Sequence, residues 1–248
     1  EKTLLAVRAQ TLSSLPDSTL VETLWRQQSG GRVQIGFLLT GNTIMRLNGQ
    51  SERLEGLIAR RGHSVDSLET AHEYLRLFCS YLEGEDGSFR LLPDPSTRPP
   101  GLVIDREKME EAIRLWRISN EDLTENDVAR CRTALNSDTF DAWAQDNIAL
   151  SVKEAGDRVY LADAIVLYSC RLFNAHFRID ASDPAQIHVA MLQDEWTGML
   201  VGGVPQFVGG FTYPPFDGVT PLDGEKVSTR GPLYESESLI MLFSMLTV

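Results

Sequence analysis

The sequence predicts an α+β protein in which helices pack on a mostly antiparallel β-sheet. The N-terminal half is expected to hold helices and a hairpin, and the C-terminal half is expected to be rich in strands. Two observations carry this prediction. Apolar residues with helical spacing come before apolar residues that alternate with a period of two, and the chain shows no regular β-α-β alternation.

Prolines and glycines mark where the chain divides. Four of the eleven prolines lie in the run PDPSTRPPG at residues 93–101. Such a run is typical of a linker, so the sequence predicts an N-terminal α+β part at 1–92 and a C-terminal part at 102–248. The alternative is a single domain that includes all three segments.

The residues ahead of Val33 are expected to be helical, and a β-hairpin is expected after them. Val33, Ile35 and Phe37 alternate, and the turn residues Thr40-Gly41-Asn42 separate them from the second strand, TIMRL.

Two helices are predicted after the hairpin. Ser51 is a suitable N-cap for a helix that runs to Arg61, and Gly62 is a suitable stop. Asp66 and Glu69 have the spacing of a capping box for the second helix. One face of this second helix is apolar and carries Leu68, Ala71, Leu75, Phe78 and Leu82.

A strand, SFRLL, and three more helices are predicted next. Asp105 would cap the first of these helices, whose apolar face carries Met109, Ala112, Ile113 and Trp116. On its polar side Glu110 and Arg114 are spaced for an ion pair. The second helix, at about 124–135, would bury Val128, Cys131 and Leu135, and the third would run through FDAWAQ at 140–145.

The spacing of apolar residues changes to a period of two from Ile148 onward. A strand through Leu150 and Val152 is predicted, with a turn at EAGD. The segment 159–172 fits a helix as well as a strand. Its density of Val, Ile and Tyr favours the strand.

An antiparallel hairpin is predicted around residues 181–185. If Asp180 faces Gln186, one face of the hairpin is entirely apolar, which supports this register. That face pairs Ile179 with Ile187, Phe177 with Val189 and Ala175 with Met191.

The opposite face of this hairpin is polar and is the candidate ligand-binding site. It places Arg178 opposite His188 and His176 opposite Ala190, with Asp180 and Asp194 on the same face. The imidazoles suit acid–base catalysis, and the guanidinium suits a carboxylate or phosphate. The simpler interpretation, which we favour, is the solvated side of a half-buried sheet.

A long irregular region at 198–231 holds the candidate interaction residues. Loops of this length without their own structure are uncommon and are often functional. Four aromatic residues in it would cover a pocket, dock a partner or, as the more frequent case, pack against their own domain; they are Phe207, Phe211, Tyr213 and Phe216.

Composition narrows the classes of partner. A net charge of −12 disfavours nucleic acid as a partner, and no apolar run is long enough for a membrane span.

His63 and His72 are expected to be solvent-exposed. No C-x-x-C pair is present, so the three cysteines, Cys79, Cys131 and Cys170, are expected to be buried thiols of a cytoplasmic protein. A cleaved signal peptide is the alternative.

No catalytic, metal-binding or cofactor-binding motif is present in the sequence. The sequence therefore predicts a non-enzymatic binding or interaction protein that contacts a protein partner through residues 205–217. The alternative is an enzyme or a binder of a small anionic ligand that uses His176, Arg178 and His188.

Overall fold

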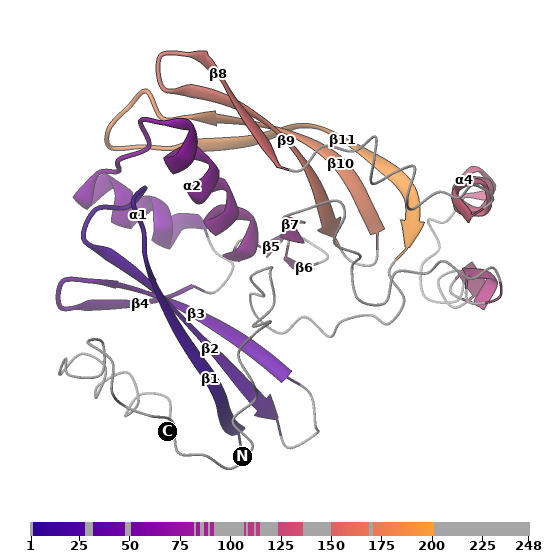
Figure 1. Ribbon diagram of the computed structural model, residues 1–248, viewed down its shortest axis with the longest axis horizontal. Coiled ribbons are helices and arrows are strands. Elements are labelled where there is room, and N and C mark those ends of the chain that lie inside the picture. Colours follow the sequence, from indigo (N-terminus) through magenta and orange to yellow (C-terminus); the bar gives the residue numbers. More distant parts are fainter. Residues whose placement is uncertain are drawn as a thin grey trace.

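Two antiparallel sheets with two helices between them form the main part of the protein (Figure 1). The computed structural model describes most of the chain up to residue 200, namely residues 2–27, 32–47, 51–81, 83–84, 87–88, 90–91, 107, 109–111, 113–114, 124–135, 150–168 and 171–200. The α+β class predicted from the sequence is confirmed.

The N-terminal sheet has four strands in the order β1-β2-β3-β4: β1 (Lys2–Thr11), β2 (Ser18–Gln27), β3 (Arg32–Thr40) and β4 (Thr43–Leu47). The predicted hairpin is confirmed as β3 and β4, with Gly41 at the turn in the left-handed region at φ 56°. The predicted helices ahead of it are wrong, because that segment forms β1 and β2. This sheet is apolar on both faces, with Leu20 buried on one and Val21 on the other, so the alternation typical of a strand is hidden.

The helices α1 (Ser51–Arg61) and α2 (Leu68–Tyr81) follow, as predicted. Gly62 ends α1 at φ 74°. The cap of α2 differs from the prediction: Ser67 accepts a hydrogen bond from the Thr70 amide at 3.3 Å, and Thr70 accepts one from the Ser67 amide. Leu68, predicted on the buried face, is 44% exposed because it is the first residue of the helix.

The main hydrophobic core lies around these two helices and includes residues from both sheets. Ala71, Leu75 and Val65 are completely buried in it. Residues from the N-terminal part, such as Leu38, and from the C-terminal part, such as Ile179, belong to this same core.

The C-terminal sheet contains β7 (Arg90–Leu91), β8 (Ser151–Gly156), β9 (Val159–Tyr168), β10 (Arg171–Asp180) and β11 (His188–Leu200). Its main path is β11-β10-β9-β7, and β8 also pairs with β9. The strand interpretation of 159–168 is confirmed. The predicted strand SFRLL is present only in short pieces, since β5 (Glu83–Gly84) pairs with β6 (Gly87–Ser88), and β7 pairs with β9.

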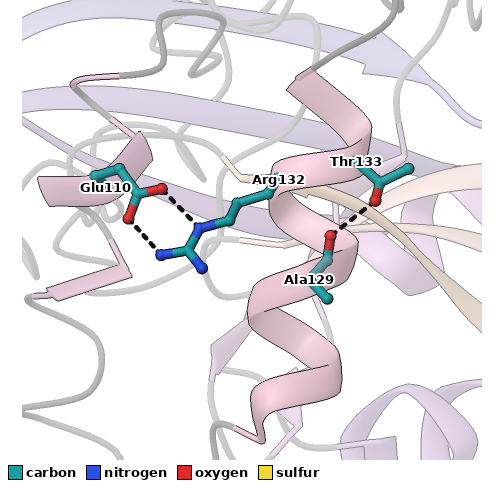
Figure 2. A network of polar contacts seen from close by, with 4 residues as sticks. All are labelled: Glu110, Ala129, Arg132 and Thr133. Atoms are coloured by element: carbon teal, nitrogen blue, oxygen red, sulfur yellow. Dashed lines mark hydrogen bonds and ion pairs between the residues drawn. The ribbon is translucent and has the colours of Figure 1, made fainter.

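Helix α4 (Glu125–Leu135) packs on β11, with Val128 and Cys131 buried as predicted. The predicted pair between Glu110 and Arg114 is wrong. Arg114 pairs with Glu111 at 2.6 Å, while Glu110 accepts two hydrogen bonds from Arg132 of α4 at 2.7 and 2.8 Å (Figure 2). Glu110 thus pairs with a residue of another helix instead of with Arg114 of its own helical segment.

Some predicted features fall outside the described residues: the linker at 93–101, the helix at 140–145 and all of the chain after Leu200. The four aromatic residues of the candidate interaction segment are among them. No helix in the described part of the chain is both long enough and apolar enough to cross a membrane.

Candidate functional site

The hairpin of β10 and β11 has a longer loop than predicted. Asp180 pairs with His188, so the loop covers residues 181–187. The predicted register is wrong by two positions. The loop has its own turn, in which the Ala185 amide donates to the Asp183 carboxylate at 2.8 Å, and Ile187 is buried in the core as part of this loop.

A shift of two residues keeps every side chain on its predicted face, because the side-chain period of a strand is two. Ile179, Phe177 and Ala175 accordingly remain on the buried face. A β-bulge at Leu192 then changes the faces further along β11. Beyond the bulge Asp194 pairs with Ala175, so the prediction that it shares the face of His176 is wrong.

The solvent-facing side of this sheet, which we call the polar face, carries His176 and Arg178 together with Asp163 of β9. Asp163 lies opposite His176, and its carboxylate is 2.5 Å from the Nδ1 atom of that imidazole. Lys153 of β8 approaches the same carboxylate at 4.0 Å. The sequence did not reveal Asp163, because its position depends on the pairing between β9 and β10.

Arg178 is held by the neighbouring Asp180 at 3.0 Å and lies opposite Ala190. The predicted pairing of Arg178 with His188 is therefore wrong. Asp180 also accepts hydrogen bonds from the hydroxyl and amide of Ser182. These bonds, and the one from Arg178, lower the pKa of the Asp180 carboxyl below its usual value.

The polar face is open. The side chains of His176 and Arg178 are 49% and 46% exposed, and each already has an acidic partner. His188 instead borders a hollow of about 450 Å³ whose other wall includes Glu55 of α1. The two histidines predicted to act together thus have different surroundings. In the described residues no group of three or more His, Cys, Asp or Glu side chains is placed to hold a metal ion.

The other two histidines are not simple solvent contacts, so that prediction is wrong. His63 is only 8% exposed; its Nε2 atom is 2.8 Å from the Asp183 carbonyl, and its Nδ1 atom accepts a hydrogen bond from the Val65 amide. His63 therefore ties the α1–α2 connection to the hairpin loop. His72 is half-buried beside Arg76, and burial, followed by this positive charge, lowers its pKa.

Cys79 and Cys131 are buried, as predicted. Burial raises the pKa of Cys79 far above its usual value, which makes this thiol unreactive. Cys170 lies outside the described residues.

No protein-family model matches this chain, and neither a curated protein nor a solved structure shows significant similarity to it. We therefore infer its function from the geometry of its own surface.

Proposed function

We propose that this acidic protein is a non-enzymatic interaction protein and that strand β11 belongs to its contact surface. The observation that carries the proposal is the exposure of two large apolar side chains next to each other on this strand. Met191 is 43% and Leu192 is 58% exposed. Adjacent exposed apolar side chains on a sheet are a typical feature of protein-binding surfaces.

The position of β11 supports the same function. Among the described strands β11 is the end of the main path of the C-terminal sheet. An edge strand offers main-chain N–H and C=O groups to an added strand. The aromatic segment at 205–217 begins five residues after β11 ends at Leu200, so both belong to one stretch of sequence.

The polar face suits the rim of such an interface. Its charges are exposed and paired, as in the contacts of Asp163 with His176 and of Asp180 with Arg178. Exposed ion pairs contribute little to stability, and they help to select a partner.

The alternative function is binding or turnover of a small anionic ligand at His176, Arg178 and His188. One observation favours it: the carboxylate of Asp163 lies 2.5 Å from His176 Nδ1. A carboxylate in this position orients an imidazole and fixes its tautomer, as in many general bases. The exposure of both side chains and the separate surroundings of His188 favour the interaction function.

The test is native mass spectrometry of the protein purified from its source, followed by variants of β11. Leu192→Asp is expected to remove a co-purifying protein, because it places a charge in the apolar part of the contact. Leu68→Asp is the matched control, since Leu68 is also exposed, at 44%, but lies on α2. Equal retention of the partner by both variants would refute the role of β11. A bound small molecule in place of a protein, lost in Arg178→Ala, would support the alternative.

A further inference from the structure

A groove of about 460 Å³ lies between strand β4 and helix α1. Its walls carry three arginines: Arg46 on β4, and Arg53 and Arg60 on α1. Glu52 is an acidic residue of the same wall. The groove is therefore positively charged, in a chain whose formal net charge is −12.

The three guanidinium groups are available to a ligand. Each arginine is exposed, and none of the three makes a hydrogen bond or an ion pair with any described residue. Arg114, Arg132 and Arg178, which are also exposed, each have an acidic partner. The lining holds three positive charges and one carboxylate, that of Glu52, so the cations repel one another, and a bound anion would relieve that repulsion.

Ordinary structural roles account for only part of this cluster. Arg60 lies in the last turn of α1, where a positive charge complements the helix dipole, and Arg46 protects a strand at the edge of its sheet. Arg53 lies near the start of α1, where the dipole disfavours a cation. Among the described residues Arg53 has no partner that would offset this cost.

Gly56, in the middle of α1, is a second and independent observation. A mid-helix glycine is less favourable than alanine, yet a Cβ atom at this position would meet nothing within 4 Å. Packing against described residues therefore does not require a glycine here. Gly56 lines the groove, so its missing side chain keeps the groove open.

We propose that the groove binds a small organic anion, with a phosphate or carboxylate group at each end of its body. Guanidinium groups bind both of these anions through paired hydrogen bonds. Arg53 and Arg60 are two helical turns apart, so their backbones are separated by about 10 Å. The floor includes the buried side chains of Leu38 and Leu57, which suit an apolar middle section.

The experiment is isothermal titration calorimetry with two probes. Azelate carries carboxylates at the ends of an apolar chain, and fructose 1,6-bisphosphate carries phosphates at the ends of a polar one. At least one probe is expected to bind the full chain, and the tighter probe shows which combination of end group and body the groove prefers. Loss of one guanidinium contact is expected to weaken binding about tenfold in Arg53→Gln and in Arg60→Gln.

Arg61→Gln is the matched control. Arg61 neighbours Arg60 on the same helix and is exposed, but it does not line the groove. Its loss is expected to change affinity less than twofold, which is the effect of net charge alone.

Gly56→Leu should weaken binding by filling the groove without changing charge, and circular dichroism checks that each variant is folded. The proposal is overturned if neither probe binds the wild-type protein, or if Arg61→Gln weakens binding as much as Arg53→Gln.

Discussion

The two sheets of this protein differ in what their faces contact. The N-terminal sheet is apolar on both faces: Leu20 and Leu38 belong to the main core, while Val21 and Phe37 form a second apolar cluster with Trp25. The C-terminal sheet buries one face in the main core and exposes charged residues on part of the other, as His176 and Arg178 show.

Because of this difference, we expect replacements in the two sheets to have different effects. Replacements at the buried positions of β2 and β3, such as Val21 and Phe37, should affect folding, because apolar residues are buried on both faces of these central strands. Replacements on the polar face of the C-terminal sheet should affect recognition, because its side chains are exposed and their ion pairs contribute little to stability.

The largest expected effect is that of Phe37→Ala. Phe37 is 4% exposed on the outward face of the N-terminal sheet. Its truncation should lower the free energy of unfolding by about 3–5 kcal/mol, as for other buried phenylalanines. Urea denaturation measures this loss. A loss below about 1 kcal/mol would show that the outward face is not a second core and would remove the contrast between the sheets.

Gly36→Ala should have the next largest effect. A Cβ atom at Gly36 would lie 2.2 Å from Cε1 of Tyr81, whose hydroxyl donates a hydrogen bond to the buried Glu22 at 2.5 Å. We expect a loss of about 1–3 kcal/mol from this overpacking.

Gly56→Ala is the control for Gly36→Ala, because its Cβ would meet nothing within 4 Å. In α1 it should stabilise the protein by about 0.5–1 kcal/mol. Thermal unfolding of both variants checks the prediction, which fails if they shift the melting temperature in the same direction.

His176→Ala and Arg178→Ala should change the free energy of unfolding by less than about 0.5 kcal/mol. Their side chains are about half exposed, at 49% and 46%. The urea measurement used for Phe37→Ala applies here as well. A loss above about 2 kcal/mol would mean that another part of the protein covers the polar face.

The smallest effect concerns His72, which is half-buried between α2 and the N-terminal sheet. Burial and Arg76 lower its pKa below 6.5, so the unfolded chain binds a proton first as the pH falls. The contribution of the neutral His72 side chain to the free energy of unfolding is complete well above pH 6.5. It is lost as the pH falls through 6.5 towards the lowered pKa of His72. NMR titration of the imidazole measures this pKa, and His72→Gln should remove that part of the pH dependence. A midpoint at or above 6.5 would contradict the prediction.

The candidate site could be predicted only in part. The alternation in β10 correctly placed His176 and Arg178 on the solvent side, since the opposite face had to be apolar. The same alternation fits any register that differs by two residues, so it could not choose the partner of Arg178. The bulge at Leu192, which moves Asp194 off the polar face, had no signal in the sequence.

Elements with local signals could be predicted from the amino-acid sequence. The turn at Thr40-Gly41-Asn42 defined a hairpin, and the helical spacing of apolar residues defined α1 and α2, because a turn and a helix depend on residues close together in the chain. The sequence could not determine β2, where burial on both faces removes the alternation.

Contacts between residues of different elements became known only from the three-dimensional fold. The contact of Asp163 with His176 depends on strand pairing, and the contact of Glu110 with Arg132 depends on packing between helical segments. The arginine groove combines residues of β4 and α1, although the longest basic run in the sequence there is the pair Arg60-Arg61. Such contacts arise from packing between separate elements, about which the spacing within one element carries no information.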